Sequence, residues 1–170
     1  MTDKIDRTKP FLHKELCYQV LEEVYATRKV YGSSQKETAY QNGLAEELDE
    51  HSLPYKQEVG IKIISPKTGK IVGKHRLDFI INTKVILETK AMTYTSKKIE
   101  DQLYTYLRST PYKIGYLINF ASTKLYIKRI ILTNDRKRFL NLSSVRSVGN
   151  LKQRIQNKQT VTDKIDLFNP

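Results

Sequence analysis

The sequence predicts an α/β fold with a mixed central sheet flanked by helices, and three observations indicate this class. Apolar residues recur at helical spacing near the start of the chain, which is typical of amphipathic helices. Two runs rich in β-branched residues surround the polar turn Asn82-Thr83-Lys84, which predicts a hairpin over residues 76–90. A helical segment at residues 97–109 separates this hairpin from the apolar run 114–120, and a crossover of that length permits parallel pairing.

The first two elements are expected to be helices. Residues 10–31 form the first, with Pro10 at its start, where the missing N–H costs nothing. Gly32-Ser33-Ser34 ends this helix. A second helix is expected over residues 35–50. Its apolar stripe consists of Tyr40, Leu44 and Leu48.

Strands and one further helix follow. Asn119 lies within a compact apolar run, so we expect it to be a hydrogen-bonded core amide. The last strand is expected to be more exposed. In order, the elements are a strand at 55–64 after Pro54, a turn at 66–70, the hairpin at 76–90, a helix at 97–109 between Ser96 and Pro111, and strands at 114–120 and 125–132.

Length and composition limit the function. The 170 residues fit one domain, placed at 1–133, followed by a basic tail or small helical appendage at 134–170. The formal net charge of +12 suggests a polyanionic partner, with nucleic acid favoured over a membrane. Cys17 is the only cysteine, which excludes an intrachain disulfide and a Cys-rich zinc site. No apolar run is long enough for a signal segment or a membrane span, so a cytoplasmic protein is expected. The sequence leaves the choice between a monomer and a homodimer open.

The hairpin carries two carboxylates that need an explanation. If its turn spans Asn82 to Lys84, Ile81 faces Val85 and the same register places Asp78 directly opposite Glu88. Side chains alternate along a strand, so Lys90 shares a face with Glu88. Like charges directly opposite one another are destabilising, and a divalent cation would cancel their repulsion. The alternative is that both acids are solvated, with Lys90 as a partial counterion.

The second helix offers another acid. Ser34 to Glu37 fits a capping box, but Glu37 also lies on the inward stripe, so a helix cap and a place in a metal site both fit. Tyr40, one turn on, either braces Glu37, contacts phosphate, or is a core tyrosine.

Three further residues are candidates for contact with a nucleic-acid strand. Arg76 pairs with Lys90 in the hairpin register, which fits phosphate docking as well as a surface ion-pair network. Gln102 and Tyr106 are four residues apart and share a helix face, either at a functional site or at the shoulder of the apolar stripe.

These segments resemble the PD-(D/E)XK nuclease superfamily, in which an αβββαβ core carries an Asp on its second strand and Glu-x-Lys on its third. More narrowly, the chain resembles the GxxExxY family of small bacterial proteins, and its Gln-x-x-x-Tyr pattern is similar to that of the RecB-like branch. The resemblance runs from about Leu16 to Ile131, and Ser34 stands where that family has its glycine. The matching segments are 37–40, 76–78, 87–91, 102–107 and 115–120.

The resemblance implies a restriction-endonuclease-like core and a nuclease that requires Mg²⁺, with Mn²⁺ as a substitute. It implies metal ligation by Asp78, Glu88, the backbone carbonyl of Thr89 and Glu37, with Lys90 orienting water or stabilising charge on the phosphate. The contacts with the bound strand that the resemblance implies are Gln102 and Tyr106. Tyr40 and Arg76 are further candidate substrate contacts from their own positions.

Without an evident base-reading element, we expect cleavage of DNA with little sequence specificity. The alternatives are an RNA-directed nuclease and a catalytically silent module that binds nucleic acid or protein on the same fold.

Overall fold

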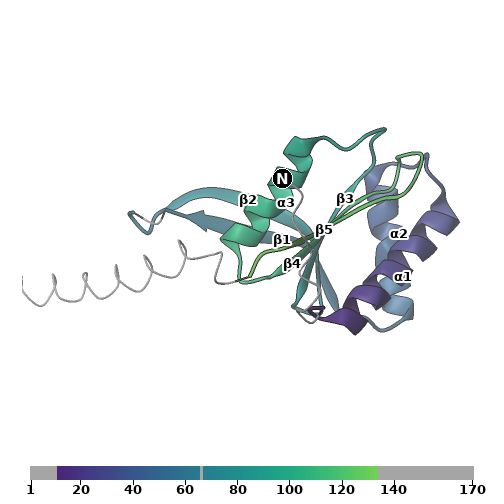
Figure 1. The fold of residues 1–170 in the computed structure, drawn as a ribbon, viewed down its shortest axis with the longest axis horizontal. Helices are drawn as coiled ribbons and strands as arrows, with labels where there is room; N and C mark the ends of the chain where they lie inside the picture. The colour runs from purple at the N-terminus through teal and green to yellow at the C-terminus, as the bar shows by residue number, and fades with distance from the viewer. Residues whose placement is uncertain (1–10, 66, 134–170) are drawn as a thin grey trace, which may run out of the picture.

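Five strands form one mixed sheet in the order β1-β2-β3-β4-β5 (Figure 1). The computed structural model describes residues 11–65 and 67–133. All neighbouring strands are antiparallel except β3 and β4, which are parallel and joined through α3. The order of elements is the predicted one. Their bounds are α1 (Lys14–Tyr31), α2 (Glu37–Glu50), β1 (Tyr55–Ile64), β2 (Ile71–Ile81), β3 (Val85–Lys90), α3 (Lys97–Ser109), β4 (Ile114–Asn119) and β5 (Tyr126–Ile131).

Helices cover both faces of the sheet (Figure 1). α1 and α2 pack on one face, where Val24 and Leu44 belong to the same cluster as Leu87. α3 packs on the other face, where Leu103 and Leu107 belong to the same cluster as Ile86. Adjacent residues of β3 therefore enter different cores, which is why this strand is buried almost throughout. β4 is buried over its whole length for the same reason.

Gly115 allows α3 to lie close against β4. A Cβ atom at this position would be only 2.8 Å from Cδ1 of Leu103, so a larger residue would force the side chain of Leu103 or the helix to shift. This close packing fixes the height of α3 above the centre of the sheet, where the hairpin residues lie.

The predicted register of the β2–β3 hairpin is confirmed. Ile81 pairs with Val85 and Phe79 pairs with Leu87. Asn82 and Thr83 adopt left-handed backbone conformations, with φ of 47° and 51°, and they turn the chain between the two strands. Asp78 and Glu88 come directly after the last pair of this ladder, so the predicted Asp78–Glu88 pair is not part of it.

Two helix starts differ from the prediction. α1 begins at Lys14, because His13 has a φ of 51°, which a right-handed helix cannot contain. Pro10, the expected first residue, lies outside the described residues. α2 begins at Glu37 with Lys36 at its N-cap and no side-chain cap, so the expected capping box from Ser34 is not formed.

The predicted tail at 134–170 also lies outside the described residues. No helix within 11–65 or 67–133 is long and apolar enough to cross a membrane.

Candidate active site

The two strands of the hairpin separate at Asp78. Their ladder ends at the Phe79–Leu87 pair, one position before the two carboxylates would meet. Leu77 and Ile80 both belong to the apolar cluster under α3, although strict alternation along a strand would put them on opposite faces. The alternation of side chains along β2 is therefore interrupted near Asp78, and the side chain of Asp78 enters the gap between β2 and β3.

Hydrogen bonds hold Asp78 in that gap. Its Oδ2 accepts bonds from both the backbone N–H and the hydroxyl of Thr89, each at 2.8 Å. The hydroxyl of Thr89 in turn accepts a bond from Nε2 of Gln41 on α2, at 3.0 Å. A chain of donors therefore connects α2 to this carboxylate.

Three charged groups meet around the end of β3. Nζ of Lys90 lies 3.0 Å from Oε1 of Glu88 and 3.5 Å from Oε1 of Glu37 at the start of α2. It also donates to the backbone carbonyl of Thr89 at 2.6 Å. The predicted convergence of Glu88 and Lys90 on one face is thus present. Glu37, from α2, joins them at the end of β3.

Burial strongly affects the charge on Glu88. This carboxylate is 3% exposed, and its burial, together with the nearby charge of Asp78, raises its pKa to about 7. Lys90 opposes that rise. Burial also works to lower the pKa of Lys90, but the three surrounding carboxylates outweigh it, so the pKa of Lys90 is raised and its ammonium stays charged. The site therefore holds a fixed cation beside an acid that exchanges its proton near neutral pH.

α3 brings Tyr106 to the same place. Its ring is 2% exposed, and burial followed by the charge of Glu88 raises the pKa of its hydroxyl. Gln102 donates a hydrogen bond from Nε2 to that hydroxyl. The ring of His75 on β2 packs at 5.0 Å from the ring of Tyr106. The predicted pair on α3 therefore flanks the carboxylates, with Gln102 on the solvent side.

This arrangement agrees with a sequence match. Residues 14–130, more than half of the chain, match the family described as the PD-(D/E)XK nuclease superfamily. The chain belongs to this superfamily. Glu88-Thr89-Lys90 reads as the (D/E)XK of the family name, while Leu77 precedes Asp78 where the name has proline. Membership assigns the chain to the nucleases, and the five-stranded mixed sheet with helices on both faces fits a restriction-endonuclease-like core.

Two solved structures are similar to this nuclease. One is the crystal structure of SSO0001, with 21% identity over 78% of this chain and 67% of that chain, and a TM-score of 0.45. The other is an alkaline exonuclease (LHK-Exo) from Laribacter hongkongensis, with 12% identity over 97% of this chain and 89% of that chain, and a TM-score of 0.42. Because both TM-scores are low, we base no assignment on them. No curated protein matches the sequence.

Nucleases of this superfamily use divalent metals, and the residues present fit one. Oε2 of Glu88 is buried and has no hydrogen-bond partner within the described residues. A buried carboxylate oxygen left without a partner is costly, and a cation would satisfy it. The oxygens of Asp78, Glu88, Glu37 and the Thr89 carbonyl are hard donors of the kind that suits Mg²⁺ or Mn²⁺. The oxygens of the three carboxylates do not all lie within 4.8 Å of one another in the described part of the chain, so the set is not drawn together as it stands.

Two predicted substrate contacts have surroundings that differ from the prediction. Tyr40 is completely buried, donates to the carbonyl of Gly32 at 2.9 Å and stacks on Phe120 at 4.7 Å. It is a core residue that ties down the loop between α1 and α2, so it cannot reach a phosphate. Arg76 is exposed but lies 3.4 Å from Glu58, and it is not paired with Lys90, because the β2–β3 ladder does not extend that far.

Asn119 is a satisfied core amide, as predicted. It is completely buried and accepts a bond from the N–H of Met92 at 3.0 Å. It also donates to the carbonyl of Met92 and to the hydroxyl of Thr95. These bonds anchor the segment between β3 and α3 to the end of β4, which gives Asn119 a structural role.

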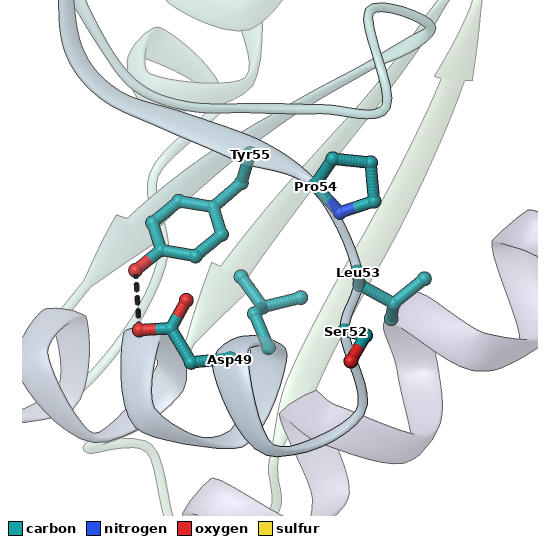
Figure 2. A pocket seen from close by; sticks show the side chains of 6 residues that line it. Asp49, Ser52, Leu53, Pro54 and Tyr55 are labelled. Carbon is teal, nitrogen blue, oxygen red and sulfur yellow. Dashed lines mark hydrogen bonds between the residues drawn. The ribbon is translucent and has the colours of Figure 1, made fainter.

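Two other features lie apart from the predicted site. Among the described residues, the group whose potential ligand atoms lie within 4.8 Å of one another is Glu23, Glu47 and His51, between α1 and the end of α2. A pocket nearby is lined by Leu48, Asp49, Ser52, Leu53, Pro54 and Tyr55, and Figure 2 shows the hydroxyl of Tyr55 bonded to Asp49. Neither set contains a residue of the superfamily motif.

Sequence reasoning missed two residues that hold the site. Gln41 lies one turn after Glu37 on α2, and this spacing was the available signal, because residues four apart share a helix face. The hydroxyl of Thr89 gave no signal, since a threonine in a strand is ordinary. Its role appears only when β2 turns Asp78 toward β3.

Proposed function

We propose that this protein is a metal-dependent nuclease that hydrolyses phosphodiester bonds, with DNA as its substrate. The convergence of Asp78, Glu88 and Lys90 where the hairpin opens carries this proposal, together with the buried oxygen of Glu88 that has no partner. Superfamily membership supports the reaction class. The net charge of +12 supports a polyanionic substrate.

Mg²⁺ is the proposed metal, with Mn²⁺ as a substitute. Asp78, Glu88 and the Thr89 carbonyl would hold it, and Glu37 is close enough to Lys90 to contribute from α2. A divalent metal in such a site supplies Lewis-acid activation of the phosphate and of the attacking water.

The chain's own residues supply orientation and charge. Lys90 keeps its ammonium charged beside Glu88 and Glu37, so it is ready to hold a water molecule or to stabilise charge that develops on the phosphate. Thr89 and Gln41 keep Asp78 from rotating. Holding reacting groups in position in this way lowers the entropic cost of reaching the transition state.

Gln102 and Tyr106 would border the bound strand from the α3 side. Arg76 is exposed and stays a proposed phosphate contact, if Glu58 releases it. None of the described residues around the carboxylates forms an evident base-reading element, which supports low sequence specificity.

We also propose that the chain belongs to the GxxExxY family, near the RecB-like branch, on the segments that resemble them. The proposed domain organisation is a nuclease domain at 1–133 with a basic tail at 134–170.

The test is cleavage of linear, circular, single-stranded and duplex DNA and of RNA, with Mg²⁺, Mn²⁺ or EDTA. We expect metal-dependent cleavage of DNA, and a loss of at least about 100-fold in Asp78→Ala, because a metal ligand is removed. Binding to DNA in EDTA should stay close to that of the wild type. Equal binding with no cleavage by the wild type would instead identify a binding module, and preferential cleavage of RNA would correct the substrate.

A further inference from the structure

The outer half of the β1–β2 hairpin forms an arm that extends away from α1 and α2 (Figure 1). We call residues 59–65 and 67–76 the basic arm. Its sequence contains no Asp or Glu. Its basic residues are Lys62, Lys67, Lys70, Lys74 and Arg76, all of them exposed.

The register places the basic residues of the two strands on one face. Lys62 pairs directly with Lys74, and Gly60 pairs with Arg76. Facing residues of an antiparallel pair share a side of the sheet, so these three cations project from the same face. Because Gly60 has no side chain, no side chain lies directly opposite Arg76, whose guanidinium lies 3.4 Å from the carboxylate of Glu58, just before the arm.

The other face of the arm is already occupied. Val59 and Ile61 pack against the apolar cluster under α3, and His75 lies against Tyr106. This packing holds the arm against the nuclease core, so its basic face has a fixed direction. The arm ends at Arg76, two residues before Asp78, so it leads to the candidate active site.

No stabilising interaction within the described residues accounts for the facing pair of Lys62 and Lys74. Like charges directly opposite each other destabilise a sheet. No carboxylate of the described residues forms an ion pair with Lys62 or Lys74. Such a pair is favourable when an anion lies across both strands.

We propose that the outer face of the basic arm binds the phosphodiester backbone of the nucleic acid and directs it toward Asp78. The choice of nucleic acid over another polyanion rests on the proposed nuclease function. A two-stranded β-ribbon also fits the width of a DNA major groove. Lysine contacts to phosphate carry no sequence information, so the arm gives affinity and position without sequence preference.

The test is the salt dependence of binding to a fluorescent DNA duplex in EDTA, where no cleavage occurs. The variant Lys62→Gln/Lys74→Gln removes two charges and keeps most of each aliphatic stem. Its matched control is Lys56→Gln/Lys84→Gln, which removes two exposed charges outside the arm, one on β1 and one in the turn between β2 and β3. A second test pair, Lys67→Gln/Lys70→Gln, lies in the turn and leaves the paired strands intact.

We expect the Lys62/Lys74 variant to bind at least about ten-fold more weakly at low salt, and its slope of log affinity against log salt to fall by about 2, close to 0.9 for each phosphate contact. The control should keep the wild-type slope. If the Lys62/Lys74 variant does not fold, the Lys67/Lys70 variant replaces it, and the same decrease in the slope of log affinity against log salt is expected.

Wild-type affinity and slope in both arm variants would overturn the inference, while metal-dependent cleavage by these variants would leave the proposed function standing. Loss of binding by the arm variants, with no cleavage by the wild type, would keep the inference and reject the proposed function.

Ile71 and Val72 are exposed close to these lysines, so binding to vesicles with and without phosphatidylserine is also measured. Arm variants that lose vesicle binding but keep DNA binding would assign the arm to a membrane and overturn the inference.

Discussion

Thr89 donates two hydrogen bonds to a single oxygen of Asp78, one from its backbone N–H and one from its hydroxyl, both at 2.8 Å. Two donors on one oxygen fix the plane of the carboxylate as well as its position. Thr89 is completely buried, so no water competes for the bonds. The middle residue of the Glu-x-Lys motif therefore orients the acid of the neighbouring strand.

Thr89→Val tests this relationship. Valine has nearly the same shape but lacks the hydroxyl, so Asp78 keeps one donor and the amide of Gln41 loses its acceptor. We expect the free energy of unfolding to fall by about 1–3 kcal/mol, because a buried polar group loses its partner. The Mg²⁺ concentration needed for half-maximal cleavage should rise, since Asp78 is less constrained.

Thr89→Ser is the matched control, because it restores the hydroxyl on a smaller side chain. Its metal requirement, measured by Mg²⁺ titration of cleavage, should be close to that of the wild type. Urea unfolding measures its stability. A valine variant with an unchanged Mg²⁺ requirement would show that the hydroxyl does not orient Asp78 for metal binding.

Glu88→Gln tests the pH dependence of the metal-free protein. The folded chain keeps the proton of Glu88 up to a pH of about 7, against 4.5 for an ordinary glutamate. Between these values the folded state binds more protons than the unfolded state, so the wild type loses stability as the pH rises through this window, by on the order of 2–3 kcal/mol. Glutamine does not titrate and lacks this loss.

The measurement is urea unfolding in EDTA across that pH range. The stability of Glu88→Gln relative to the wild type should increase as the pH rises and level off above about pH 7. A constant difference between the two proteins would mean that Glu88 titrates normally.

Tyr106→Phe tests the contribution of α3. The substitution keeps the ring packing on His75 and removes the hydroxyl bonded to Gln102. We expect cleavage to slow by roughly ten-fold, which corresponds to about 1.4 kcal/mol, while the fold is retained. Separate measurements of kcat and KM show whether the hydroxyl acts in binding or in the reaction.

The control for this variant is Tyr104→Phe, on the same helix but 42% exposed. It should keep wild-type kcat and KM. If Tyr106→Phe also keeps both constants, the hydroxyl of Tyr106 has no part in the site.

Tyr40→Phe tests the corrected role of Tyr40. The hydroxyl bonds to Gly32 and Gln35 are lost, so the free energy of unfolding should fall by about 1 kcal/mol. Cleavage by the folded protein should not change, because the side chain is completely buried. A large loss of cleavage with unchanged stability would return Tyr40 to the substrate-binding residues.

Local patterns predicted the elements and one decisive register. The turn at Asn82 and Thr83 sets the pairing of the strands on either side of it, and the sequence predicted this pairing correctly as far as Phe79 and Leu87. The predicted pair of Asp78 with Glu88 lies one position beyond the ladder, where the strands separate. The spacing of Gln102 and Tyr106 likewise predicted that they share a face of α3, and the hydrogen bond between them confirms this. These features depend on neighbours within a few residues, which a sequence displays directly.

Interactions between distant segments were not predictable in the same way. A helical stripe shows which residues share a face but not what that face meets, so Tyr40 and Glu37 on α2 looked equally suited to the site. Packing on Phe120 buried Tyr40, whereas Glu37 at the start of the helix reached Lys90. Arg76 found Glu58 because the strands had separated where Lys90 was expected to face it.

Local spacing along the chain is enough to predict the order of the helices and strands, the hairpin register, and the motif of Asp78, Glu88 and Lys90. Which side chains surround that motif, and which are buried in the core, depends on how distant segments pack in the folded protein. The reason is physical: burial, the raised pKa of Glu88 and the bonds of Thr89 to Asp78 all require segments that meet only when the sheet assembles.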